Sequence, residues 1–173
     1  MKRKNAVARV AYPAILGALA VIIVYLASLA PTGRWGIVAV AGLLPAAAVV
    51  SVGLKAGFLC WAGASILMLL LVPEKFCALL FTALFGLYPM VKSAAEKPRK
   101  RVLEYAVKLV FFNAVFTVLY LAMMGAMMAS LPPVLGSSPW VLYLAANIVF
   151  VAYDYGFSRL IAVYIARVQR AVH

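Results

Sequence analysis

The chain has 173 residues, of which 68% are hydrophobic and 12% are charged, and its net charge is +12. Soluble proteins are about 45–50% apolar and about 25% charged, so this composition excludes an ordinary soluble domain. In a soluble protein the positive charge would suggest nucleic acid, but in a membrane protein Lys and Arg mark the loops that stay in the cytoplasm. We therefore expect a membrane protein that contacts anionic lipid headgroups and binds no nucleic acid.

Six apolar segments follow one another, and each predicts a membrane-spanning helix because about 20 apolar residues cross a bilayer. The predicted spans are 8–30, 35–52, 58–72, 76–91, 106–130 and 140–165. With short loops they fill the chain, which predicts one transmembrane domain over 1–173. The uncharged run 10–33 is too long for a signal peptide, so we expect a retained first helix.

Proline and glycine divide the spans. Pro31 to Gly33 predict an outer turn, Pro45 predicts a kink in the second span, and Pro73 to Lys75 predict a second outer turn. Gly53 to Gly57 predict an inner turn around Lys55. The third and fourth spans are then short, which suggests local thinning of the bilayer. No long sequence repeat is visible.

The segment 92–105 is the only long charged stretch. We expect it to lie at the inner membrane surface, partly helical and in contact with anionic lipid. A docking surface for a partner protein is the alternative.

The positions of the positive charges predict the topology. With six crossings and both termini in the cytoplasm, 14 of the 16 Lys and Arg residues are cytoplasmic, and only Arg34 and Lys75 lie outside. The expected fold is an all-α bundle of six transmembrane helices, as a multi-pass protein of a bacterial cytoplasmic membrane.

Asp154 is the only acidic residue inside a predicted span, and such a charge is stable only if it is paired or lines a cavity. Helix geometry places several basic or hydrogen-bonding groups at a similar depth. We expect a structural clamp in which Asp154 pairs with Lys108, Lys92 or Arg159 and Asn113 completes the hydrogen bonds; a proton or ion site is the alternative. The predicted buried polar cluster comprises Tyr88, Lys92, Lys108, Asn113, Asp154 and Arg159.

A second polar group is predicted at the outer ends of the spans. Aromatic residues at this height usually form the interfacial belt of a membrane protein. If an outward-facing ligand pocket exists, its candidate substrate-binding residues are Arg34, Trp35, Glu74, Trp140, Tyr143 and Asn147.

Ala14 and Ala18 lie four residues apart in the first span, and such pairs of small residues let a second helix backbone approach. A six-span chain of this length with an Ala-x-x-x-Ala pair resembles the substrate-binding S components of energy-coupling-factor vitamin transporters. The phrases Ala-Gly-Leu-Leu-Pro (41–45) and Gly-Leu-Lys-Ala-Gly (53–57) also resemble the turn between spans 2 and 3 of such proteins. The resemblance implies a small-molecule pocket open to the outside, and a transmembrane coupling subunit docked on Ala14 and Ala18. The first outer loop is shorter than the lid that this family often uses.

The leading hypothesis is therefore a subunit for uptake of a small, vitamin-like molecule of unidentified structure. The chain has no P-loop, so ATP energy would come from separate ATPases. The alternative is a non-transporting membrane interaction or assembly protein that uses the basic inner segment. An intramembrane enzyme ranks last, because the only His is His173 and no catalytic motif is present. Cys60 and Cys77 lack the spacing of a metal or redox site, so we expect no metal and no cofactor.

Overall fold

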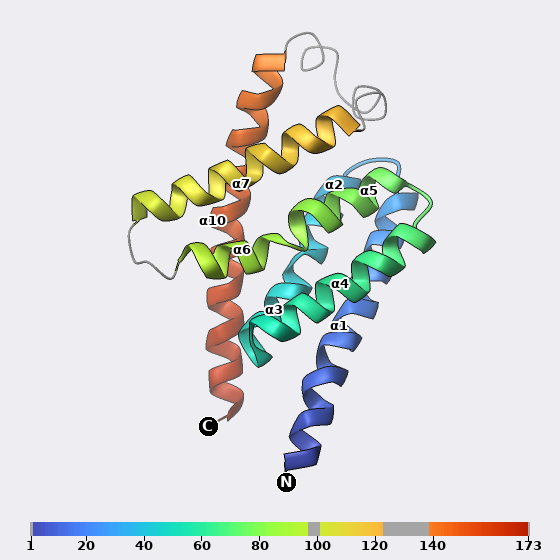
Figure 1. Cartoon of the computed structure of the whole chain (residues 1–173), viewed down its shortest axis with the longest axis vertical. Coiled ribbons are helices and arrows are strands. Elements are labelled where there is room, and N and C mark those ends of the chain that lie inside the picture. Colours follow the sequence, from blue (N-terminus) through green and yellow to red (C-terminus); the bar gives the residue numbers. More distant parts are fainter. Residues whose placement is uncertain (1, 97–100, 123–138, 173) are drawn as a thin grey trace. The chain divides into compact units, whose positions relative to one another are not determined.

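The computed structural model describes the backbone of residues 2–96, 101–122 and 139–172, and side chains over 10–96, 101–122 and 140–167. Every element in these ranges is helical (Figure 1). Within these ranges, six helical stretches are long and apolar enough to cross a membrane, which agrees with the predicted number of spans. They cover Val10–Leu29, Arg34–Val52, Leu54–Leu71, Lys75–Ala95, Arg101–Ala122 and Trp140–Arg167. Which side of the membrane the termini face stays a prediction.

Some spans consist of more than one helix. The helices are α1 (Lys2–Leu29), α2 (Arg34–Ala41), α3 (Leu43–Val52), α4 (Leu54–Leu71), α5 (Lys75–Leu80), the π-helix η1 (Phe81–Phe85), α6 (Tyr88–Ala95), α7 (Arg101–Ala122) and α10 (Pro139–Val172). Contacts divide the chain into unit 1, residues 1–104, and unit 2, residues 105–173. Each unit is described by itself.

In unit 1, α1 packs closely along α4, and α3 packs against α4. The buried residues of α1 are mostly small or β-branched, among them Gly17, Ala20 and Val24, and Gly17 lies against α4. A Cβ atom on Gly17 would lie 3.3 Å from the carbonyl oxygen of Cys60, so glycine allows this approach of two backbones.

The second span breaks at Gly42, where α2 ends and α3 begins. Pro45 lies in the first turn of α3, a position that tolerates proline because the amide there needs no helical acceptor. The second span is therefore interrupted at the glycine three residues before the proline, close to the place where the sequence predicts a kink. A Cβ atom on Gly42 would lie 2.6 Å from the carbonyl oxygen of Phe85, so only glycine fits against the fourth span here.

The fourth span is also broken. Its helix widens into the π-helix η1, in which the amide of Gly86 donates to the carbonyl of Phe81 (2.7 Å). A turn at Gly86 and Leu87 follows, and α6 begins at Tyr88 with Pro89 in its first turn. Trp61 of α4 donates its indole N–H to the carbonyl of Thr82 (2.8 Å), which stabilises this irregular backbone.

The predicted inner turn around Lys55 and the short third and fourth spans are wrong. Gly53 alone reverses the chain, with φ of +116°, a conformation that side chains disfavour. Lys55 lies on α4, and Gly57 packs against Val49 of α3 instead of forming part of a turn. The third and fourth spans therefore reach 18 and 21 residues, which removes the argument for a thinned bilayer.

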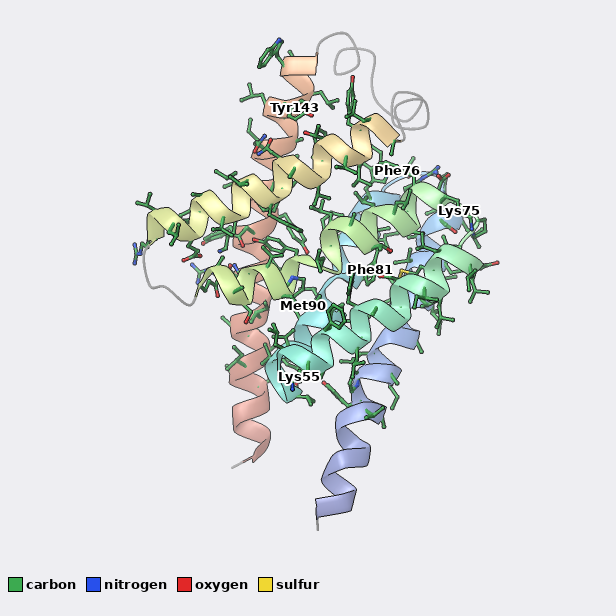
Figure 2. The ribbon with its side chains drawn as sticks, in the orientation of Figure 1. Lys55, Lys75, Phe76, Phe81, Met90 and Tyr143 are labelled. Carbon is green, nitrogen blue, oxygen red and sulfur yellow. The ribbon has the colours of Figure 1, made fainter. Side chains whose placement is uncertain are left out.

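The turn between α4 and α5, which the sequence predicts to lie outside, is held by its charged side chains. Glu74 accepts a hydrogen bond from the amide of Phe76 and caps α5, while Lys75 donates to the carbonyls of Leu69 (2.9 Å) and Val72 (3.1 Å) at the end of α4. Figure 2 shows Lys75 and Phe76 at this end of unit 1 and Lys55 at the other end of α4.

In unit 2, α7 and α10 pack as an antiparallel pair, as their hydrogen bonds and ring contacts show. α7 begins at Arg101, earlier than the predicted 106, so the last part of the charged segment 92–105 is helical. Residues 123–130 of the predicted fifth span lie outside the described residues.

Candidate functional site

Three pairs of polar side chains link α7 to α10 inside unit 2, and we call them the polar ladder: Lys108 with Asp154, Asn113 with Asn147, and Thr117 with Tyr143. As the residue number rises along α7 it falls along α10, as an antiparallel pair requires. Successive pairs are four or five residues apart on α7 and four or seven apart on α10, so the ladder extends over about 15 Å at 1.5 Å per residue.

The pair nearest the start of α7 is an ion pair. Lys108 Nζ lies 3.3 Å from Asp154 Oδ2, and the side chains are 2% and 12% exposed. Lys108 also lies over the ring of Tyr105, 5.7 Å from its centre. A charge in the membrane is costly, and a buried partner offsets that cost by leaving no net charge.

The middle pair is a reciprocal amide pair. Asn113 Nδ2 donates to Asn147 Oδ1 (2.9 Å), and Asn147 Nδ2 donates to Asn113 Oδ1 (3.0 Å). Each amide gives its second N–H to the carbonyl four residues earlier on its own helix, Leu109 or Tyr143. Every N–H of both amides is therefore satisfied, which suits polar groups in a membrane.

The third pair, nearest the start of α10, joins two hydroxyls, because Thr117 Oγ1 and Tyr143 Oη lie 2.7 Å apart. Aromatic rings fill the interface beside it. The rings of Phe112 and Phe150 stack with centres 4.3 Å apart, and Phe116 meets Tyr143 edge-on at 5.1 Å. The ladder thus combines polar specificity with close apolar packing.

The polar ladder brings together residues that the sequence pattern assigns to separate groups. Asp154 pairs with Lys108, one of its three predicted partners, whereas Asn113 bonds to Asn147 of the predicted outer group and not to Asp154. Arg159 does not join the ladder, since it donates to Tyr155 Oη (2.9 Å from Nη2) on the exposed face of α10. Its spacing of four residues from Tyr155 favours that local contact.

The two other predicted cluster residues lie in unit 1. Lys92 is buried on α6 and forms an ion pair with Glu96 (3.0 Å), four residues along the same helix. Tyr88 is fully buried at the start of α6. Both residues therefore belong to the fourth span, Lys75–Ala95, and not to the α7–α10 pair.

The predicted outer residues of unit 1 engage one another. Arg34 Nη1 lies 3.3 Å from Glu74 Oε2, and the ring of Trp35 packs on Phe76 with centres 5.5 Å apart. In unit 2, Trp140 is 86% exposed, while Tyr143 and Asn147 belong to the polar ladder.

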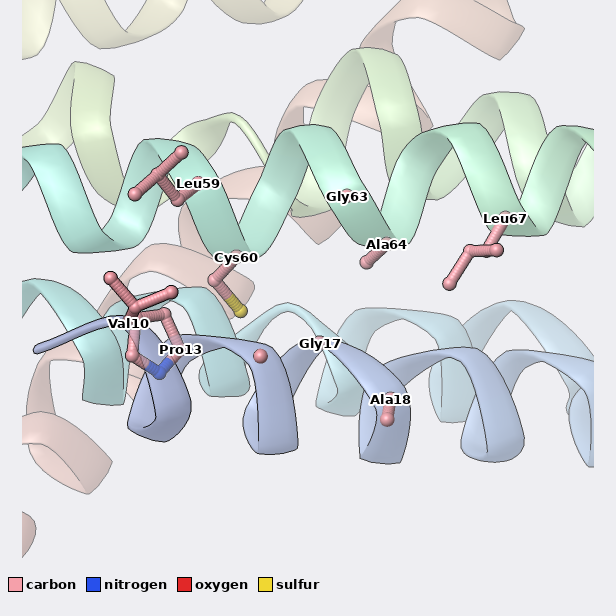
Figure 3. A pocket seen from close by; sticks show the side chains of 10 residues that line it. Val10, Pro13, Gly17, Ala18, Leu59, Cys60, Gly63, Ala64 and Leu67 are labelled. Atoms are coloured by element: carbon pink, nitrogen blue, oxygen red, sulfur yellow. The ribbon is translucent and has the colours of Figure 1, made fainter. Parts of the chain in front are cut away.

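An apolar groove runs between α1 and α4, with a volume of about 290 Å³ (Figure 3). The groove is lined by Val10, Pro13, Ala14, Gly17, Ala18, Leu59, Cys60, Gly63, Ala64 and Leu67. Gly17 and Ala64 lie at the closed contact of the two helices, and the thiol of Cys60 points towards α1. Ala14 and Ala18 are exposed at the open side of the groove.

Sequence reasoning missed two features of these sites. Thr117 was not singled out, although its four-residue spacing from Asn113 on one helix face could have indicated it. The breaks at Gly42 and Gly86 were also not connected, although both begin the motif Gly-Leu-x-Pro, at 42–45 and 86–89.

A scan against protein-family models, a search of curated proteins and a search of solved structures each found no match for this chain.

Proposed function

We propose that this chain is the ligand-binding membrane subunit of a small-molecule uptake system, and that a separate transmembrane subunit docks on the groove between α1 and α4. The observation that carries the proposal is the exposure of Ala14 and Ala18 beside the closed contact at Gly17. An internal role for the alanine pair would require both methyl groups to be buried within the chain.

The surface of α1 around the alanines supports docking. Ile15 and Leu19, on the next face of the same helix, are 67% and 43% exposed and present large side chains to the lipid. Ala14 and Ala18 form a strip of small side chains between Ile15 and Leu19 on one side and α4 on the other. Helices in a membrane associate mainly by close packing, so a partner helix gains most where the side chains are small.

The proposed subunit has both termini in the cytoplasm, where its basic residues meet anionic lipid headgroups. ATP energy would come from separate ATPases, because the chain has no P-loop. The bacterial cytoplasmic membrane is the proposed location.

A non-transporting interaction or assembly protein is the second candidate. It is favoured by the contacts at the outer end of unit 1, where Arg34 and Glu74 pair with each other and Trp35 packs on Phe76. Such contacts use polar groups that a ligand would otherwise meet. This candidate would use the basic inner segment 92–105 for its interactions, and it differs from the uptake subunit in that no small molecule binds.

The docking surface is tested by Ala14→Trp combined with Ala18→Trp. The two indoles would fill the open side of the groove, so we expect a folded protein that no longer co-purifies with its partner from native membranes. The matched control is Ile15→Trp with Leu19→Trp, which has the same spacing and depth on a neighbouring face. Loss of folded protein in the alanine double variant alone, or retention of the partner, would contradict docking at this surface.

Mass spectrometry of small molecules that co-purify with the intact protein separates the two candidates. The uptake proposal predicts one compound at a stoichiometric level. An interaction protein predicts a partner protein but no such compound.

A further inference from the structure

Two spans of unit 1 are interrupted at corresponding points. The motif Gly-Leu-x-Pro occurs at 42–45 in the second span and at 86–89 in the fourth, and each helix breaks at the glycine of the motif. In both spans the proline lies in the first turn of the next helix. The two spans run in the same direction through the bundle, because one helix separates them in the chain. In membrane transporters, paired Gly/Pro interruptions point to the binding site.

The two breaks lie against each other. The carbonyl of Phe85 faces Gly42, and α2 packs on η1 while α3 packs on α6. Neither Pro45 nor Pro89 has an N–H to donate to the carbonyl four residues earlier. The π-helix adds a further departure from regular bonding, and such short π segments are frequent at functional sites.

Two buried hydroxyls lie beside the broken fourth span. Ser65 of α4 is 5% exposed, and neither its Oγ nor the buried Oγ1 of Thr82 has a hydrogen-bond partner within the described part of the chain. The Trp61–Thr82 hydrogen bond shows that α4 and η1 pack directly together. Ser65 is one helical turn from Trp61 on the same face of α4, so it lies towards the same span. Buried polar groups without partners are rare and call for an explanation such as a bound molecule.

The two hydroxyls also lie at a similar distance from the turn between α4 and α5. Ser65 lies six residues before the end of α4 and Thr82 seven residues after the start of α5, which is about 9–11 Å below the outer turn in each case. The Arg34–Glu74 ion pair lies at that outer turn. No charged residue occurs between 34 and 55, between 55 and 74, or between 75 and 92, so the stretches around Ser65 and Thr82 offer hydroxyls and backbone groups, and the charges lie towards the ends of the spans.

We infer that a small uncharged molecule with hydrogen-bonding groups binds between α4 and the broken fourth span, with the hydroxyls of Ser65 and Thr82 as its partners. This inference rests on the proposed uptake function and locates the ligand in unit 1, away from the outer ends of the last spans. Access runs from the outside, past the Arg34–Glu74 pair.

The site is tested with the charged, membrane-impermeant thiol reagent 2-(trimethylammonium)ethyl methanethiosulfonate. Cys60 and Cys77 are first replaced by Ala, and Ser65→Cys or Thr82→Cys is then added to the full-length protein. Methanethiosulfonates react with ionised thiols, which form only where water reaches. Added from outside to intact cells, the reagent should cause loss of the free thiol in both variants.

The matched control is Ala64→Cys, next to Ser65 on α4 but facing α1 and only 1% exposed. It should keep its thiol. Each variant is first checked by size-exclusion chromatography, and only protein that elutes at the wild-type volume is compared. The inference is overturned if both Ser65→Cys and Thr82→Cys keep their thiols while Gly33→Cys in the outer turn is modified, or if Ala64→Cys is modified equally. Neither result bears on partner docking at Ala14 and Ala18, which is measured separately.

Discussion

At the scale of single residues, the Lys108–Asp154 pair shows how physical cost leads to a prediction. A lone carboxylate in a span requires a partner, and this requirement singles out Asp154 and a short set of cations from the amino-acid sequence alone. The choice of Lys108 over Arg159 depends on how the two helices face each other, since Arg159 lies on the exposed face of α10. The depth of a residue along its helix can be predicted from the sequence, but the neighbouring helix that its side chain faces cannot.

Asp154→Ala should lower the free energy of unfolding by about 3–5 kcal/mol, because it leaves the buried Lys108 ammonium without its partner. The measurement is detergent-induced unfolding followed by circular dichroism. Adding Lys108→Met should restore much of the loss, since the ammonium that Asp154 balanced is then also removed. Arg159→Gln is the control and should change stability little. An Asp154→Ala protein as stable as the wild type would contradict the clamp.

Asn113 and Asn147 show the limit of depth arguments. Depth assigns them to different clusters, yet they form two mutual hydrogen bonds of 2.9 and 3.0 Å. Amides pair well with each other, and this complementarity outweighs the bond from Asn113 to Asp154 that depth alone suggests.

At the scale of the elements, composition and apolar run length are enough to predict six helical spans, because the backbone in a bilayer must satisfy its own hydrogen bonds. The predicted ends of the third and fourth spans are wrong for one physical reason. The sequence interpretation treats glycine as a turn residue throughout 53–57, whereas Gly57 serves close packing against Val49. Turn glycines and packing glycines have the same sequence signature.

The crossing of the two broken spans predicts unequal effects of two glycine substitutions in α2 and at its end. Gly42→Ala should destabilise the protein by about 1–3 kcal/mol, because its methyl group would overlap the carbonyl of Phe85. Gly36→Ala meets no atom within 4 Å and should stabilise α2 by about 0.5–1 kcal/mol. Thermal unfolding of the two variants measures the difference. Equal midpoints would show that the second and fourth spans do not touch at Gly42.

At the scale of the whole molecule, unit 1 contains four spans and unit 2 contains the paired α7 and α10. An even number of spans is what the predicted placement of both termini in the cytoplasm requires, and that placement stays a prediction. The proposed partner surface belongs to α1 and α4 of unit 1, and the proposed ligand site lies between α4 and the fourth span. If both proposals hold, α4 contributes one face to each site and would connect ligand binding to partner docking.

The central claim is that a separate transmembrane subunit covers Ala14 and Ala18. The most direct measurement is photocrosslinking in native membranes, with p-benzoylphenylalanine placed at Ala18 in one strain and at Leu19, on the next face of α1, in another. We predict that the Ala18 position yields an adduct with a second, different polypeptide and that the Leu19 position does not. An adduct only with lipid, or only with another copy of this chain, at Ala18 would contradict the account.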